Sequence, residues 1–363
     1  MQERRDSFYR GGHELPIAPE PPTEELMRIA RIIPQSVRLG TSSWASPEWK
    51  GIVWSRFSST RNLALEGLRA YSSHPLFSMA GVDRAYYRPL SMLQYAGFAE
   101  QVPSSFRFLV KAPSEIVDPV RRGMNGKPLG LNPGFLDSAM ADRVFIQPVL
   151  EGLGPKAGPI VFEFPALPRE WVRTREDCVQ QIARLEKFLD ALPPVPEEAP
   201  NAFYAVEIRT PAMYTPRFAS MLSCRGVRLV VGVHPAMPSI VRQMNAVFSM
   251  DGSSEVGPSA LLRGPLVIRW SLAVGNRFDD EVRQYGQFSR IQRPDPVTRE
   301  GIVNLILAAV KSNQRAFVVA SNRAEGCAPL TMMSIAKRLA EKISLARDEA
   351  AAKILRPVTR RGF

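Results

Sequence analysis

The sequence has few of the residues that build covalent or metal-based sites. Among 363 residues there are 3 cysteines and 3 histidines. Cys178, Cys224 and Cys327 are far apart and odd in number, which favours reduced thiols in a cytoplasmic protein over a disulfide framework. Only His234 is expected at the end of a strand, so a histidine-rich metal centre is not expected, and we predict no cofactor.

Long apolar segments and glycine-rich phosphate motifs are missing as well. No apolar run has the length of a membrane span, and the opening MQERRDSFYRGG lacks the apolar region of a signal peptide. No G-x-G-x-x-G follows the first predicted strand, and the segment 121–134 lacks the Walker spacing. We therefore expect a cytoplasmic protein with no membrane partner and no standard dinucleotide or P-loop site.

The charge balance is strongly basic. The formal net charge is +12, with a pI of about 9.9. Such an excess favours anionic partners, either nucleic acid or phosphate-containing metabolites, although a solubility charge spread over the surface is the alternative. Because the basic residues form no long run, a disordered nucleic-acid-binding arm is not expected.

Eight apolar, strand-like segments alternate with amphipathic segments along the chain. They occupy 37–43, 77–87, 106–113, 158–165, 203–209, 227–235, 265–271 and 315–322. Helical periodicity is clearest in 174–192, 298–313 and 330–343, and Thr174 with Asp177 has the spacing of a capping box. The alternation predicts the α/β class and a (β/α)8 TIM-like barrel, with an open doubly wound sheet as the competing topology.

The barrel is predicted to be a single domain with additions. Residues 1–36 form an N-terminal extension, 37–345 the barrel domain and 346–363 a basic C-terminal tail. A long loop, 114–158, follows the third strand, and 191–200 is a proline-rich connector.

Five motifs in order resemble the YecE-like family, known as domain of unknown function 72. They are RLGTSSW, FRFLVKAP, LGPKAGPIVFEFP, VEIRTPAMY and VVASNRAEGCAPLTM. The resemblance spans roughly 37–345 and implies a TIM barrel without a settled activity. Gly81 and Asp83 stand where many members carry Glu-x-Asn, and Val233, His234 and Pro235 stand where many carry Asp-Ser-Pro.

Polar or ionisable residues close nearly every predicted strand. They are Trp44, Asp83, Arg88, Lys111, Glu163, Glu207, Arg209, His234, Arg269 and Asn322. The carboxyl ends of barrel strands carry the active site in enzymes of this fold, so the set predicts a pocket at the barrel mouth. A structural ion-pair network is the alternative interpretation.

Within this set we expect Glu163, Glu207 and Lys111 to be catalytic and the other members to bind substrate. Two carboxylates in different surroundings suit general acid and base roles, and arginine forks suit phosphate groups. Inward residues of odd-numbered strands share a level, so Lys111, Arg209 and Arg269 should lie close together near Glu207. A Mg²⁺ or Mn²⁺ site is a less favoured alternative; its ligands would be Asp83, Glu163, Glu207 and His234.

Three functions remain open from the sequence. The chain is an enzyme acting on an anionic, phosphate-containing substrate, a non-catalytic nucleic-acid-binding protein that uses the same basic mouth, or a scaffold whose barrel has lost its chemistry. A deep pocket favours the first, and a steep salt dependence of nucleic-acid binding favours the second.

Overall fold

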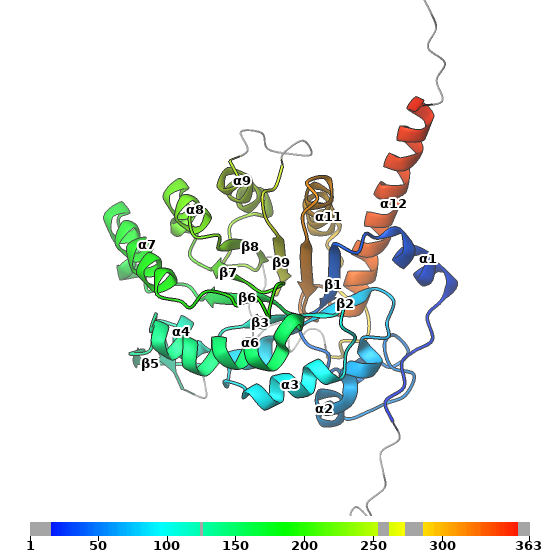
Figure 1. The fold of residues 1–363 in the computed structure, drawn as a ribbon, viewed down its shortest axis with the longest axis horizontal. Coiled ribbons are helices and arrows are strands. Elements are labelled where there is room, and N and C mark those ends of the chain that lie inside the picture. Colours follow the sequence, from blue (N-terminus) through cyan, green and yellow to red (C-terminus); the bar gives the residue numbers. More distant parts are fainter. Residues whose placement is uncertain (1–15, 124–125, 253–260, 273–285, 355–363) are drawn as a thin grey trace, which may run out of the picture.

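A closed barrel of eight parallel strands forms the centre of the protein (Figure 1). The computed structural model describes residues 16–123, 126–252, 261–272 and 286–354. Around the barrel the strands follow the order β1-β10-β9-β8-β7-β6-β3-β2. Their bounds are β1 Val37–Thr41, β2 Phe77–Val82, β3 Arg107–Lys111, β6 Ala157–Phe164, β7 Phe203–Ile208, β8 Arg228–Val233, β9 Leu266–Trp270 and β10 Ala316–Ala320. The predicted barrel and all eight predicted strands are confirmed.

Helices surround the strands as the alternating pattern requires. Their bounds are α1 Glu24–Ile32, α2 Thr60–Tyr71, α3 Met92–Glu100, α4 Ser114–Val117, α5 Ser138–Ala141, α6 Gln147–Leu153, α7 Arg175–Asp190, α8 Pro216–Ser223, α9 Ile240–Met250, α11 Pro296–Lys311 and α12 Ala328–Ile354. At the start of α7 the predicted capping box is present, because Thr174 and Asp177 satisfy each other's backbone N–H groups. None of the helices in the described ranges combines the length and apolarity needed to cross a membrane.

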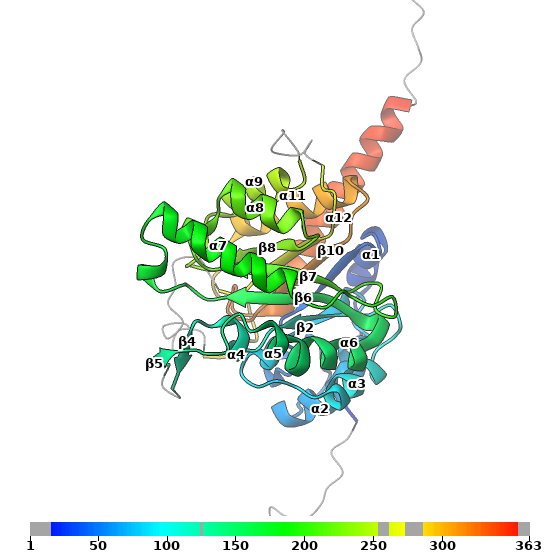
Figure 2. The ribbon, with the colours of Figure 1, turned by 60° about the vertical axis from the view of Figure 1, so that its left-hand side comes forward.

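The long segment after β3 contains a feature that the sequence did not predict. Strands β4 (Val120–Arg122) and β5 (Pro128–Leu131) pair antiparallel and form a short ribbon outside the barrel. Figure 2 shows this ribbon at the lower left, beside α4 and below α7 in that view. All four residues of β5 are exposed, so no alternation of apolar and polar residues marked it as a strand.

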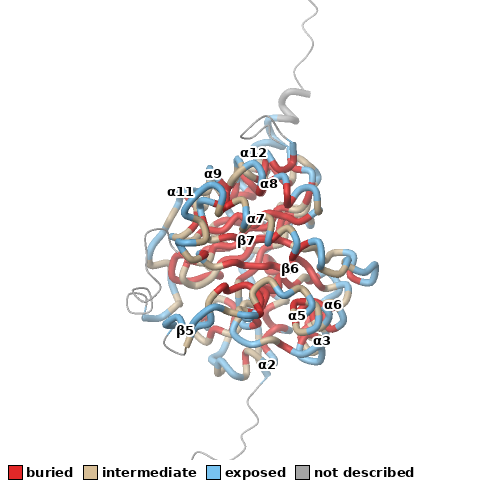
Figure 3. Tube along the Cα trace, turned by 90° about the vertical axis from the view of Figure 1, so that its left-hand side faces the viewer, coloured by how far each residue is buried: buried red, intermediate tan, exposed pale blue. Residues whose placement is uncertain are grey.

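Two apolar cores hold the barrel together. Most residues of the barrel strands are buried: all of β6 is, and so is β7 from its third residue on (Figure 3). Inside the barrel, eight side chains form a separate cluster: Met79, Leu109, Val161, Ala205, Val230, Val267, Phe317 and Val319. A larger cluster lies between the strands and the helices. The period-2 alternation of the strands therefore sends one set of side chains inward and the other toward the helices.

The first and the last helix of the described chain are in contact. Helix α1 packs against α12 near the start of β1 (Figure 1). Helix α12 continues to Ile354 without a break at residue 345, so its last turns belong to the segment that we expected to be a tail. Residues 1–15 and 355–363 lie outside the described residues.

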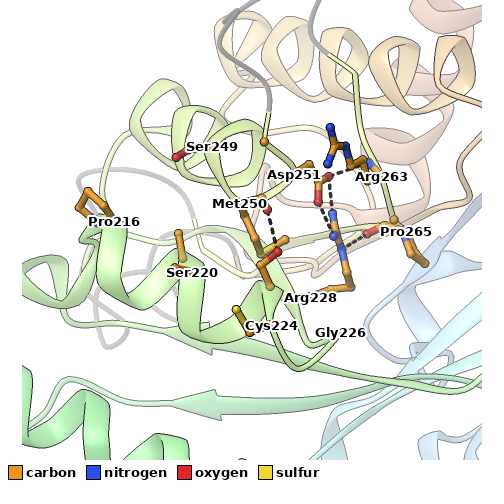
Figure 4. Close-up of a pocket in the computed structure, with 14 residues that line it drawn as sticks. Pro216, Ser220, Cys224, Gly226, Arg228, Ser249, Met250, Asp251, Arg263 and Pro265 are labelled. Carbon is orange, nitrogen blue, oxygen red and sulfur yellow. Dashed lines mark hydrogen bonds and ion pairs between the residues drawn. The ribbon is translucent and has the colours of Figure 1, made fainter.

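A buried ion pair joins β8 to the end of α9 at the amino-terminal end of the barrel (Figure 4). Arg228 donates from Nη1 and Nη2 to the two oxygens of Asp251, at 2.6 and 2.8 Å. Its Nε donates to the carbonyl of Pro265, and Asp251 also accepts from the backbone N–H of Arg263. The residues that form these bonds line a hollow of about 650 Å³. Because both charged groups are already paired with each other, we interpret this hollow as structural.

Replacing Asp251 with Asn is expected to lower the free energy of unfolding by about 3 kcal/mol, because Arg228 would keep a buried charge without a counter-ion. Urea unfolding followed by circular dichroism measures the change. The control is Glu25→Gln, which removes an exposed ion pair with Lys337 and should leave the unfolding midpoint unchanged. Equal midpoints for the two variants would contradict a structural role for the Arg228–Asp251 pair.

Candidate functional site

The layer of side chains above the inner core is charged. Lys111, Glu163, Glu207 and Arg269 each stand two residues after an inner-core residue of the same strand, so each points into the barrel. All four are buried. The alternation that fills the barrel with aliphatic groups thus ends, toward the carboxyl ends of the strands, in a layer of charge.

Arg269 of β9 lies at the centre of this layer, with its side chain 2% exposed. Its Nη1 donates to one oxygen of Glu163 and to one oxygen of Glu207. Its Nη2 donates to both oxygens of Asp83, which follows β2, at 3.1 and 3.0 Å. One guanidinium therefore joins four strands of the barrel.

Two further cations complete the network. Lys111 Nζ lies 2.9 Å from Glu163 Oε1 and 3.7 Å from the centre of the Tyr86 ring. Arg209 contacts Glu163 Oε1 at 3.0 Å and Glu207 Oε1 at 3.2 Å. We call the six charged residues the mouth cluster: Asp83, Lys111, Glu163, Glu207, Arg209 and Arg269. Three carboxylates face three cations, so the formal charges cancel.

The ion pairs of the mouth cluster keep Glu163 and Arg269 charged. Burial alone would raise the pKa of Glu163, but the positive charges of Lys111, Arg209 and Arg269 outweigh it and keep the pKa well below its usual range. Burial likewise opposes the charge of Arg269, yet Asp83, Glu207 and Glu163 raise its pKa well above the ordinary value. At neutral pH Glu163 is therefore ionised, which suits a counter-ion better than a proton donor.

The members of the mouth cluster differ in how far they reach solvent. The side chains of Asp83, Arg209 and Lys111 are 30%, 17% and 11% exposed, whereas those of Glu163 and Glu207 are 2% and 0% exposed. A ligand that enters the mouth from solvent therefore meets two cations and one carboxylate. The glutamates lie beneath them.

His234 follows β8 and is partly buried beside the cluster. Its Nδ1 accepts a hydrogen bond from the N–H of Ala236 at 3.0 Å. Burial, together with the positive charge of Arg209, lowers the pKa of His234 to about 4. The imidazole is therefore neutral at physiological pH, with its proton on Nε2.

Besides His234, three of the predicted site residues do not join the mouth cluster. Trp44 is 3% exposed and packs edge-on against Phe98, with ring centres 5.1 Å apart, so it belongs to the core between barrel and helices. Asn322 accepts from Trp49 Nε1 and from the N–H of Ala328, and so ties the loop after β1 to the start of α12. Arg88 is exposed on the loop after β2. Substrate binding by these three residues stays a prediction from the sequence.

Sequence reasoning missed two residues that shape the site. Tyr86 lies under Lys111, and burial with the negative charges of Asp118 and Glu163 raises its pKa, so its hydroxyl stays protonated. Gly232 stands in the charged layer on β8, where an added Cβ would lie 3.3 Å from the carboxylate carbon of Glu207. The spacing Asp-x-x-Tyr after β2, and a glycine in an otherwise β-branched strand, were the available signals.

The carboxylates of the mouth cluster bind guanidinium and ammonium groups rather than one another. Within the described ranges, no group of three or more His, Cys, Asp or Glu side chains has an arrangement suited to a metal ion. The alternative Mg²⁺ or Mn²⁺ site would need Asp83, Glu163 and Glu207 to exchange Arg269 for the metal, and His234 makes no bond to them. The carboxylates are thus paired with lysine and arginine side chains, as in an ion-pair network.

A wide groove adjoins the mouth cluster. It has a volume of about 1390 Å³ and runs from Tyr86 and Tyr87 along the β4–β5 ribbon. Its lining includes Arg121, Arg122 and Lys127. Arg122 pairs with Asp118, while Tyr87 is 78% exposed. The groove therefore offers aromatic and basic groups beside the mouth.

Comparisons with known proteins agree with the barrel. Residues 38–353 match the family described as "Protein of unknown function DUF72". A DUF72 family protein of Enterococcus faecalis has 18% identity and a TM-score of 0.53, with 84% of this chain and 95% of that chain covered. A DUF72 family protein of Thermotoga maritima has 16% identity and a TM-score of 0.53, with 84% and 98% covered. No curated protein matched the chain.

His234 is expected to make stability depend on pH. Its pKa is about 4 in the folded protein and near 6.5 in the unfolded chain, so only the unfolded chain gains a proton as pH falls through this window. Stability is complete above pH 6.5 and declines toward pH 4. His234→Asn keeps an acceptor for the Ala236 N–H. Because solvent screens the partly exposed imidazole, the substitution should remove about 2 kcal/mol of that loss. Denaturant midpoints at intervals of pH measure it.

The matched control is His74, which lies before β2 and has a pKa that burial lowers to about 4. His74→Asn should remove a separate share of the acid-induced loss, and the double variant should show both effects. An unchanged pH profile for His234→Asn would show that this imidazole is solvated in the folded protein.

Proposed function

The chain belongs to the DUF72 family, and from the geometry of its barrel mouth we propose that it binds and converts a small anionic, phosphate-containing substrate. The observation that carries the proposal is the layered exposure of the mouth cluster. Lys111 and Arg209 reach solvent, while the glutamates that neutralise them are buried. A phosphate group can approach these cations from solvent without displacing the buried carboxylates.

Burying charged side chains inside a barrel costs desolvation free energy. Replacing a buried ion network with apolar side chains of similar volume is often neutral or stabilising, so stability alone is a weak reason to keep one. The layer below consists of aliphatic and aromatic groups, which fill the barrel without that penalty. A binding or catalytic role accounts for the change of chemistry between the two layers.

The exposed members suggest how the roles divide. Lys111 and Arg209 would hold the anion, and Asp83 would exchange a proton with the substrate, since it is the most exposed carboxylate of the cluster. Glu163 and Glu207 would fix the positions of Lys111, Arg209 and Arg269 through the contacts described above. Direct proton transfer by Glu163 or Glu207 stays a prediction from the sequence.

The test is binding and turnover with a panel of phosphate-containing metabolites, measured by calorimetry and by product analysis. Lys111→Met and Arg209→Gln should each weaken binding of the panel member that binds by about tenfold to a hundredfold, the loss expected for a charge-assisted hydrogen bond. Asp83→Asn should reduce turnover more than affinity. The control, Arg175→Gln, changes an exposed arginine at the start of α7.

Equal affinities of the Lys111→Met and Arg175→Gln variants for every panel member would contradict the proposal. In that case the mouth cluster is a structural network.

The groove along the β4–β5 ribbon favours a second candidate, single-stranded nucleic-acid binding without catalysis. Tyr87 is available for base stacking, and Arg121 and Arg122 for phosphate contacts, along one surface. Oligonucleotide binding with a steep salt dependence, weakened by Tyr87→Ala and Arg121→Ala, would support it. Binding that these changes do not weaken would exclude the groove as the nucleic-acid surface.

A further inference from the structure

The opposite end of the barrel carries a second group of cations. Arg107 begins β3, two residues before the inner-core Leu109, and Arg315 precedes β10, two residues before the inner-core Phe317. Arg38 of β1 is the strand partner of Phe317 and therefore lies on the same face of the sheet. By this alternation all three belong to the inward-facing set of their strands, at the amino-terminal end. We call them the floor arginines.

Two of the floor arginines contact the same short loop. Arg38 Nη1 donates to the carbonyl of Ser105 at 2.5 Å. Arg107 Nη1 donates to the carbonyls of Ser104 and Phe106 at 2.6 and 2.7 Å. Bonds to consecutive carbonyls place the two guanidinium groups next to each other.

The third floor arginine and a lysine extend this positive region. Arg315 lies over the ring of Phe317, 5.8 Å from its centre, and donates to Asn201 Oδ1. Lys156 Nζ donates to the carbonyls of Ala99, in the last turn of α3, and of Val102, just after it. The positive charge of Arg107 also acts on Lys156. Every acceptor named for these four cations is an uncharged oxygen.

No carboxylate compensates the floor arginines within the described part of the chain. None of the three forms an ion pair there, whereas every cation of the mouth cluster does, and so does Arg228. Burial and then the charges of Arg107 and Arg315 lower the pKa of Arg38 to about 10. The Nε of Arg107 is buried and has no hydrogen-bond partner. Like charges held together without a counter-ion are destabilising unless an anion joins them.

A hollow of about 250 Å³ adjoins Arg38 on this side of the barrel. Its lining includes Gln35, Ser78 and Ser105, which supply neutral hydrogen-bonding groups. The hollow gives an anion a route to Arg38 from solvent.

We propose that the floor arginines form an anion site, separate from the barrel mouth, that binds a phosphate group. Guanidinium forks match the oxygens of a tetrahedral oxyanion, and the free Nε–H of Arg107 supplies an unused donor. Inorganic phosphate and the phosphate of a larger metabolite share this chemistry. Bound phosphate stabilises the folded chain because it supplies the charge that the floor lacks.

The experiment is thermal unfolding of the full chain while inorganic phosphate replaces chloride at constant ionic strength. The unfolding temperature of the wild type and of Arg175→Gln should rise with phosphate. In Arg38→Gln/Arg107→Gln the rise should be clearly smaller, corresponding to at least tenfold weaker binding at the floor, and any rise that remains belongs to the mouth. Without phosphate this variant should unfold at the wild-type temperature or above it, because a repulsion has been removed.

Arg209→Gln separates the two ends of the barrel. This mouth variant should keep the phosphate response, whereas loss of the response in Arg209→Gln alone would place the anion at the mouth and overturn the proposal. A missing response in the wild type would overturn it as well. If the double variant does not fold, Arg315→Gln replaces it, and phosphorus NMR line broadening measures binding directly. Broadening equal to that of the wild type would exclude the floor site.

Discussion

The barrel mouth depends on one buried guanidinium. Arg269 joins Asp83, Glu163 and Glu207, and through them the strands β2, β6, β7 and β9. Its hydrogen bonds go to three carboxylates. The free-energy cost of removing the arginine from water is therefore offset by three ion pairs rather than by one. Because the carboxylates are fixed from inside the barrel, their outer oxygens are in turn positioned to hold Lys111 and Arg209.

Charge balance distinguishes the two ends of the barrel. At the mouth, carboxylates and cations alternate and cancel. At the floor, the acceptors of Arg38, Arg107 and Arg315 within the described residues are neutral oxygens. The two clusters therefore differ in charge balance: the ion pairs of the mouth cluster cancel, whereas the floor arginines are excess positive charge, which attracts anions.

The sequence predicted the strands well because their apolar segments are long and regular. It also predicted that Lys111, Glu163, Glu207, Arg209 and Arg269 would meet, since alternation within a strand fixes which residues share a face. It could not predict which cation would be fully buried, because that depends on pairing across strands. Trp44 and Asn322 lie in the loops after β1 and β10, and the geometry of these loops turns both side chains toward the helices.

The remaining features lacked a periodic signal. The β4–β5 ribbon has an exposed second strand, so neither face is marked by apolar residues. Tyr86 was read as part of a strand, although it lies in a short 3₁₀ turn, Asp83–Tyr86, that brings its ring under Lys111. Turns of this kind are determined by local backbone geometry that hydrophobic patterning does not report.

The contacts of Arg269 also have a consequence for the folding pathway. Its partners Glu207, Glu163 and Asp83 are 62, 106 and 186 residues away along the chain. Bringing such distant segments together requires the closure of large loops, so the complete set of bonds forms only when β2, β6, β7 and β9 are already in place. The network therefore contributes little to the early collapse of the chain. The network stabilises the closed barrel once it has formed, so it slows unfolding more than it speeds folding.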